Sequence, residues 1–180
     1  MTPEEIYHAL QRRFGEDILV FKGEAADPSI TVAASAIHAV GEYLRYDPDM
    51  LFDSLMCLSG VDYGPDKSLG VVYHLHSTTH LHKITLKVEV ERDGGVVPTV
   101  CDIWRTAEWH EREAYDLFGM HFTNHPDHRR ILLPDDWEGH PLRKDYQVQE
   151  FYHGIRVPYT GDPPQIGMDV YRFQDREPLN

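Results

Sequence analysis

Histidines, acids and arginines supply the residue types that could do chemistry, and they gather in two stretches of the chain. Four histidines flank a predicted turn: His74, His76, His80 and His82. Three more stand beside an aspartate and two arginines: His121, His125 and His128. Imidazole is the commonest metal ligand and a frequent general base near neutral pH. A zinc site and an acid–base site are therefore the first candidates.

The spacing of both groups argues against these candidates. Side chains alternate along a strand, so His74 and His76 leave the core if Tyr73 enters it. His82 then points inward, and the first group does not converge on one ion. The arginines beside the second group repel a metal cation, and no nucleophile stands in a recognised arrangement with it. We predict ordinary sheet histidines, a turn anchored by His125, and neither a catalytic residue nor a metal ligand.

A helix is predicted between Thr106, an N-cap residue type, and Gly119, which can close it. One face is apolar: Ala107, His110, Ala114, Leu117 and Phe118. The other is predicted to be polar and solvated: Trp109, Arg112, Glu113 and Asp116. Glu111 falls at the edge of the apolar face, where a carboxylate loses water and needs a partner. We expect a guanidinium from Arg129, from Arg130 or from another chain.

The chain after this helix mixes prolines with apolar and basic side chains. Three prolines interrupt any regular element: Pro126, Pro134 and Pro141. The apolar residues are too many for a solvated linker, so the segment needs a surface to lie on. Its arginines could grip carboxylates or carbonyls of a partner, with Trp137 and Leu142 as apolar anchors. Alternatively, they fold back on the chain's own acids: Asp135, Asp136 and Glu138.

We predict contacts with a partner along this whole stretch. The positions are Glu111, Arg112, Glu113, Asp116, His125, Arg129, Arg130, Trp137, Leu142, Arg143, Lys144, Asp145 and Tyr146. Beyond them, prolines alternate with aromatic residues to the end of the chain. This pattern predicts an extended tail pressed into a partner's groove, with a disordered terminus as the alternative.

The sequence pattern of the first part of the chain predicts an α+β domain. A capping box begins a first helix that ends at Gly15, and a second helix stops before Asp47. Strands are predicted at 18–22, 30–33, 52–63, 70–76 and 82–91. The last two alternate apolar with charged residues, which indicates a mixed, largely antiparallel sheet with helices packed on one face. We place the globular domain at 1–122 and a long extended C-terminal arm at 123–180.

Composition narrows the class of protein. The 180 residues carry a formal net charge of −13, which disfavours nucleic acid as a partner. No apolar run approaches the roughly 20 residues that span a bilayer, and we expect no signal peptide. Two cysteines fall short of the four thiolates usual for an iron–sulfur cluster. The turn at Asp93 lacks the spacing of a nucleotide-binding loop, so we expect no nucleotide site here.

The motifs of the helix and the arm resemble those of a known family. They are Glu111-Arg112-Glu113, Asp116-Leu117-Phe118-Gly119, His125-Pro126, Arg129-Arg130-Ile131-Leu132, Trp137, Gly139 and Pro141-Leu142-Arg143-Lys144-Asp145-Tyr146. In this order they resemble the 30 kDa subunit, also called the C subunit, of proton-pumping NADH:quinone oxidoreductase, respiratory complex I.

The resemblance implies a noncatalytic subunit of the hydrophilic arm of that complex. It would dock chiefly on the 49 kDa-like (D) subunit, which helps form the quinone site, with the B and I subunits as further neighbours. Electrons would pass from NADH through FMN and iron–sulfur clusters in partner subunits to quinone, and this chain would hold no cofactor. It would lie at the cytoplasmic face of the bacterial inner membrane, attached only through the complex.

Two alternatives stay open. The chain could serve a related quinone-linked complex fed by ferredoxin or another donor. It could also be a free-standing His-rich metalloprotein or hydrolase, which stoichiometric zinc or iron in the purified chain would favour.

Overall fold

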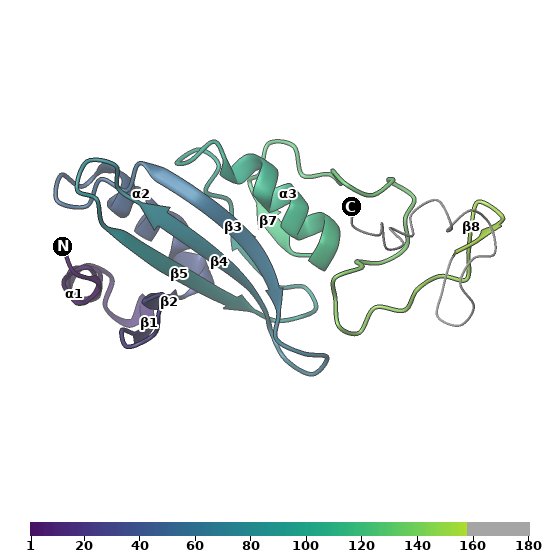
Figure 1. Ribbon diagram of the computed structural model, residues 1–180, viewed down its shortest axis with the longest axis horizontal. Coiled ribbons are helices and arrows are strands. Elements are labelled where there is room, and N and C mark those ends of the chain that lie inside the picture. The colour runs from purple at the N-terminus through teal and green to yellow at the C-terminus, as the bar shows by residue number, and fades with distance from the viewer. Residues whose placement is uncertain (158–180) are drawn as a thin grey trace, which may run out of the picture. The chain divides into compact units, whose positions relative to one another are not determined.

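A five-stranded sheet in the order β1-β2-β5-β4-β3 organises the first part of the chain (Figure 1). The computed structural model describes residues 1–157, and the predicted tail from Pro158 onward lies outside them. Residues 1–146 form one compact unit, and 147–157 belong to a second unit, which we treat by itself. The predicted arm from residue 123 therefore begins within the first unit.

The first unit contains helices and runs of consecutive strands. The helical elements are α1 (Pro3–Phe14), η1 (Gly15–Asp17), η2 (Ala34–Ala36), α2 (Ile37–Tyr46) and α3 (Ala107–Phe118). The strands are β1 (Ile18–Lys22), β2 (Ser29–Val32), β3 (Ser54–Asp62), β4 (Leu69–His76), β5 (Lys83–Val90), β6 (Val96–Pro98) and β7 (His121–Thr123). The second unit contains a short antiparallel pair, β8 (Phe151–Tyr152) and β9 (Ile155–Arg156).

Strand pairing confirms the predicted fold class. The pairs β1–β2, β3–β4 and β4–β5 are antiparallel, whereas β2 and β5 run parallel. A short parallel pair, β6–β7, forms a separate small sheet. The sheet is thus mixed but largely antiparallel, and in Figure 1 α2 lies against one of its faces.

The capping box of α1 forms as predicted. The Thr2 hydroxyl accepts a hydrogen bond from the Glu5 N–H at 3.2 Å, and the Glu5 carboxylate accepts one from the Thr2 N–H at 2.8 Å. The helix buries an apolar stripe in the core of the first unit. The core combines that stripe with α2 and the inward side chains of β4 and β5: Ile6, Leu10, Val40, Leu44, Val71, Tyr73, Leu75, Ile84, Leu86 and Val88. Burying each of the larger aliphatic side chains contributes roughly 1.5–3 kcal/mol.

Helix α3 packs against β3, which is an edge strand of the sheet. The His110 ring nitrogen Nδ1 accepts a hydrogen bond from the Leu58 N–H at 2.9 Å, and the Thr106 hydroxyl donates to the Leu55 carbonyl at 3.4 Å. Thr106 is therefore not the side-chain cap that we predicted, because its hydroxyl is used by β3 instead. These contacts satisfy backbone groups that an exposed edge strand would leave free. They also fix α3 against the sheet.

The end of α3 yields a stability prediction. Gly119 has φ +76°, and a Cβ at this position would lie 2.6 Å from the His140 ring. Gly119→Ala should therefore lower the free energy of unfolding by about 2–3 kcal/mol, combining left-handed backbone strain with a steric clash. Gly94→Ala is the matched control, because Gly94 has φ +78° but open space around it. It should cost only about 1 kcal/mol in denaturant unfolding, and equal losses would contradict the steric role of His140.

Candidate partner interface

The carboxylate of Asp116 is fully buried and lies at the centre of the segment that follows α3. One oxygen, Oδ1, accepts a hydrogen bond from the Arg130 guanidinium at 2.7 Å. The other, Oδ2, accepts three backbone N–H groups: those of Ile131 at 3.1 Å, Leu132 at 2.7 Å and Leu133 at 2.9 Å. Burial raises the pKa of Asp116, but these hydrogen bonds outweigh it and the net pKa is lowered. The carboxylate is thus held in its ionised form.

Arg130 connects this carboxylate to a second turn of the chain. Its guanidinium donates to the carbonyls of Trp137 at 2.9 Å and Gly139 at 3.0 Å. The carbonyl of Asp116 accepts hydrogen bonds from Arg130 at 3.2 Å and from the His140 Nδ1–H at 2.9 Å. The Leu142 N–H then donates to the Leu117 carbonyl at 3.0 Å. Residues 130–142 are therefore wrapped around the C-terminal turn of α3.

Arg112 holds the beginning of the same segment. Its guanidinium donates to the carbonyls of Arg129 at 3.2 Å and Arg130 at 3.0 Å, and it lies 3.1 Å from the Asp127 carboxylate. We predicted that Arg112 and Asp116 would face solvent, and this is wrong, because residues 129–133 cover that face of α3. The arginines do bind acids of the chain itself: Arg129 pairs with Asp127, Arg130 with Asp116 and Arg143 with Asp93.

Glu111 has different partners from those predicted. Its carboxylate accepts hydrogen bonds from the Thr99 hydroxyl and from the Val100 N–H, the latter at 2.9 Å. The predicted pairing with Arg129 or Arg130 is wrong, since Arg130 binds Asp116 and Arg129 lies against Asp127 at 2.7 Å. Glu111 therefore ties α3 to the chain after β6, rather than to the arm.

His125 lies beside Glu111, and both side chains are fully buried. Its Nε2–H donates to the Glu108 carbonyl at 3.0 Å, and its Nδ1 accepts from the Asp127 N–H at 3.1 Å. These two bonds use both ring nitrogens, and Nε2 lies 3.8 Å from the Glu111 carboxylate. The predicted role of His125 as a turn anchor is confirmed. Burial raises the pKa of Glu111 to about 7, although the hydrogen bonds from Thr99 and Val100 oppose this rise.

A second buried carboxylate, Asp62 at the end of β3, holds the far end of the segment. It accepts hydrogen bonds from the Lys144 N–H at 2.7 Å, from the Gly64 N–H at 2.8 Å and from the Arg92 guanidinium. Arg92 also binds Asp145 at 3.1 Å. Burial opposes ionisation, but these bonds together lower the pKa of Asp62 to about 2. Sequence reasoning missed Asp62 and Arg92, because nothing in their spacing links them to residues 144–145.

The predicted partner positions fall into two groups. Buried or nearly buried ones build the segment itself: Glu111, Arg112, Asp116, His125 and Arg130. Others lie at least partly open to solvent: Glu113, Arg129, Trp137, Leu142, Arg143, Lys144, Asp145 and Tyr146. Trp109 on α3 and Leu132 on the chain that covers it also expose their side chains. Aromatic and arginine side chains are typical of the anchors of protein interfaces. Partner contact at these positions stays a prediction.

The first histidine group lies apart from this segment. His82 is buried and its Nε2–H donates to the Met50 carbonyl at 2.7 Å, as its predicted inward orientation requires. Within residues 1–157, no cluster of three or more His, Cys, Asp or Glu side chains could hold a metal ion. In the same residues, no helix is long and apolar enough to cross a membrane.

Asp116→Asn tests the central contact of the segment. The amide supplies one acceptor instead of two and leaves the Arg130 charge without its partner, so we expect a loss of about 3 kcal/mol in the free energy of unfolding. Asp135→Asn is the matched control on an exposed residue of the same segment and should change it by less than about 0.5 kcal/mol. Denaturant titration of both full-length variants measures the difference. Similar small losses would contradict the role of Asp116.

Glu111→Gln tests the raised pKa. The unfolded chain loses this proton near pH 4.5 and the folded chain only near pH 7, so Glu111 favours the fold below pH 4.5 and loses this contribution as pH rises to about 7. The loss is about 3 kcal/mol at 1.36 kcal/mol per pKa unit. The glutamine variant should match the wild type at pH 4.5 and be more stable at pH 7.5 in denaturant unfolding. Glu113→Gln, on the exposed side of α3, is the matched control and should change the free energy of unfolding at pH 7.5 by less than about 0.5 kcal/mol.

Comparison with known proteins finds relatives of one family. A family model described as "Respiratory-chain NADH dehydrogenase, 30 Kd subunit" matches residues 30–152. A protein of Chlorobium phaeobacteroides, named as the C subunit of NADH-quinone oxidoreductase, is 48% identical over 155 residues, covering 85% of this chain and 93% of its own length. A protein of the same name from Chloroherpeton thalassium is 49% identical over 87% of this chain, which spans only 65% of that relative's length.

Two solved structures share the fold. A trypsin-resistant fragment of Nqo5 superposes with a TM-score of 0.56 at 24% identity, covering 71% of this chain and 99% of the fragment. A chain of the membrane-bound sulfane sulfur reductase, an archaeal respiratory membrane complex, superposes with a TM-score of 0.64 at 23% identity, covering 100% of this chain and 97% of its own. At these identities the structures support the architecture alone. The family match over residues 30–152 and the high identity to the curated relatives show that this chain belongs to the family of the 30 kDa subunit of respiratory-chain NADH dehydrogenase.

Proposed function

We propose that this chain is a noncatalytic subunit of the hydrophilic arm of proton-translocating NADH:quinone oxidoreductase. Relatives at 48–49% identity carry the name of the C subunit of that enzyme. The principal partner is the 49 kDa-like (D) subunit, with the B and I subunits as further neighbours. The complex passes electrons from NADH through FMN and iron–sulfur clusters in partner subunits to quinone. This chain lies at the cytoplasmic face of the inner membrane and has a structural rather than a redox role.

The observation that carries this proposal is the way two buried carboxylates hold an irregular segment. Asp116 and Asp62 fix residues 131–133 and 144 through backbone N–H groups, so the path of the chain does not depend on a helix or strand. The segment leaves Leu132 and Leu142 more than half exposed, and the Arg129 side chain is 69% exposed. Ordering such a surface before association lowers the entropy cost of binding. A surface prepared in this way, with exposed apolar side chains, suits docking on another subunit.

A related complex with another electron donor is the second candidate. The similarity to a chain of the sulfane sulfur reductase indicates that this fold occurs in a respiratory complex of a different name. The much higher identity to proteins named as the C subunit of NADH-quinone oxidoreductase favours NADH as the electron source. NADH:quinone activity of the recovered complex distinguishes the two.

Copurification from native membranes tests the proposal. A tagged full-length chain should bring down other subunits with NADH:quinone activity, whereas a chain ending at Tyr146 should fold normally but recover less of the complex. Ending at Phe122 is unsuitable, because it removes Arg130 and the N–H groups that satisfy the buried Asp116. Circular dichroism and thermal unfolding verify that the shortened chain is folded. Recovery of the full-length chain alone would contradict the proposed role.

The exposed anchors are tested separately. Arg129→Ala together with Leu132→Ala should lower recovery of the complex at least tenfold, as expected for losing more than about 1.4 kcal/mol of interface energy. The fold should be kept, since both side chains point largely to solvent. Glu24→Ala together with Leu19→Ala, at exposed residues in and after β1, provides the control. Equal recovery of the complex with both double variants would show that Arg129 and Leu132 do not belong to the interface.

A further inference from the structure

One face of the five-stranded sheet has no helix of residues 1–146 over its three longest strands. In Figure 1, β3, β4 and β5 lie toward the viewer without a helix in front of them, whereas α2 lies behind. Val71, Tyr73 and Leu75 of β4 belong to the core, so the residues that alternate with them lie on the other face. On β4 and β5 these are Val72, His74, His76, Lys83, Thr85 and Lys87. We call this side of the sheet its outer face.

Lysines gather on the outer face, although the chain as a whole is acidic. The chain carries 30 acidic residues against 17 lysines and arginines, and Lys83 and Lys87 are two of its five lysines. Strand pairing adds Lys22 of β1 to the same face, because the register joins it through β2 to Thr85. The acidic side chain that β5 contributes to this face is Glu89. The outer face is therefore more basic than the chain as a whole.

A pocket of about 380 Å³ lies in the outer face. His74, Lys83 and Thr85 line it, together with Met56 of β3 and with Asp27 from the chain before β2. Met56 stands at a bulge, where β3 has one residue more than β4, and its side chain is 61% exposed. The pocket thus places an exposed apolar side chain beside a lysine and an imidazole. These groups can contact an apolar side chain and a carboxylate of a partner at the same time.

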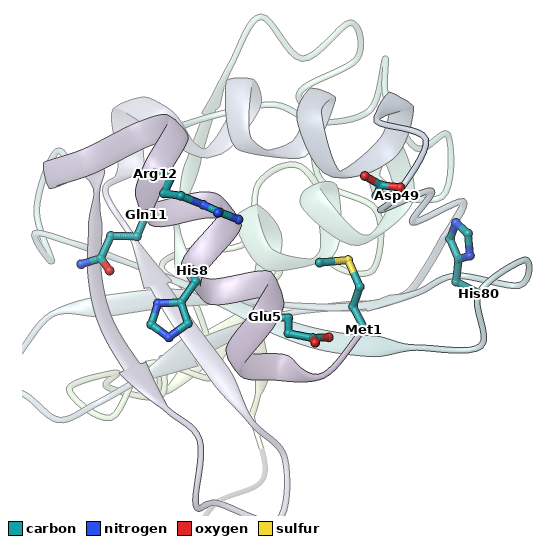
Figure 2. A pocket seen from close by; sticks show the side chains of 7 residues that line it. All are labelled: Met1, Glu5, His8, Gln11, Arg12, Asp49 and His80. Atoms are coloured by element: carbon teal, nitrogen blue, oxygen red, sulfur yellow. The ribbon is translucent and has the colours of Figure 1, made fainter.

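The depression beside α1 differs from the outer face in its charge. It measures about 900 Å³, and Figure 2 shows that Glu5 and Asp49 line it as well as Arg12. Both signs of charge are present there, so the depression favours no particular charge in a partner. The outer face of the sheet, in contrast, favours a partner that carries carboxylates.

The dimensions of the outer face indicate what part of a partner fits. Strands β4 and β5 have eight residues each and rise about 26 Å, and three neighbouring strands are about 14 Å wide. This area is well below the roughly 800 Å² that each partner buries in a stable interface between two folded proteins. It suits one segment of a partner, which binds a small surface effectively when other contacts already hold the two chains together.

We propose that the outer face of the sheet binds an acidic segment of another subunit in the assembly. This inference rests on the proposed function, and it adds a contact surface separate from the segment after α3. Carboxylates of the partner pair with Lys83 and Lys87, and an apolar side chain beside them contacts Met56. A second copy of this chain is disfavoured, because a two-fold arrangement places the same lysines opposite each other. An anionic bilayer is disfavoured, because the net charge of −13 is repelled by it.

Charge reversal on the tagged full-length chain provides the first test. Lys83→Glu together with Lys87→Glu should lower recovery of other subunits from native membranes at least tenfold, because attraction to carboxylates becomes repulsion. Arg12→Glu together with Lys67→Glu changes the net charge equally at exposed residues outside this face, and it should keep recovery close to that of the wild type. Thermal unfolding of both double variants verifies that they are folded.

The outcomes of this comparison separate the two proposals. Equal recovery with both double variants would overturn the proposed contact and leave the proposed function intact. A wild-type chain that recovers no other subunits would overturn both.

Photo-crosslinking gives a second readout that keeps both lysines. Ser59 of β3 is exposed and pairs with Val72, which lies opposite Lys87. A benzophenone amino acid at position 59 of the full-length chain should crosslink to another subunit in native membranes, in a segment richer in Asp and Glu than in Lys and Arg. An adduct with lipid, with a second copy or within this chain would overturn the proposal. The same group at position 132 reports assembly, and an adduct there without one at position 59 would also overturn it.

Discussion

The buried carboxylate of Asp116 needs hydrogen-bond donors, and the backbone of the same chain supplies them. A buried carboxylate is strongly destabilising unless hydrogen bonds and a counter-charge replace its lost water. Here Arg130 and three successive N–H groups surround it, and they come from a segment that has no regular secondary structure. Because one ion satisfies several backbone donors at once, it determines the path of the chain over α3. The aromatic, leucine and arginine side chains nearby take their positions from that path.

Other buried charged groups hold the two ends of the segment in the same way, through hydrogen bonds to its backbone. Asp62 holds residues 144 and 145 through the Lys144 N–H and through Arg92, and Arg112 holds residues 129 and 130 through their carbonyls. Glu111 differs, since it ties α3 to the chain after β6 and its burial raises its pKa. Asp116 and Asp62, whose pKa values are lowered, thus hold the segment. Glu111, whose pKa is raised, holds α3 beneath it.

Elements whose signals are local were predicted well from the sequence. The capping box at Thr2 and the inward apolar residues of β4 and β5 depend on neighbouring residues and formed as expected, although Thr85 on the opposite face of β5 is buried as well. Predictions failed where a distant part of the chain supplied the environment. Asp116 looked solvated on a helical wheel, because nothing in the helix shows that residues 129–133 cover that face. The Asp62–Lys144 contact joins residues that are 82 positions apart, and no local pattern encodes it.

Hydrogen exchange of the isolated full-length chain, read at single residues by NMR, tests most directly whether Asp116 orders the segment before assembly. The amides of Ile131, Leu132 and Leu133 donate to its carboxylate, so they should exchange far more slowly than the amides of the exposed residues Asp135 and Glu138. Slow exchange at these three positions, lost in Asp116→Asn, is the result expected for a surface prepared in advance. Exchange at unprotected rates in the wild type would contradict this account, because the segment would then be ordered only by its partner.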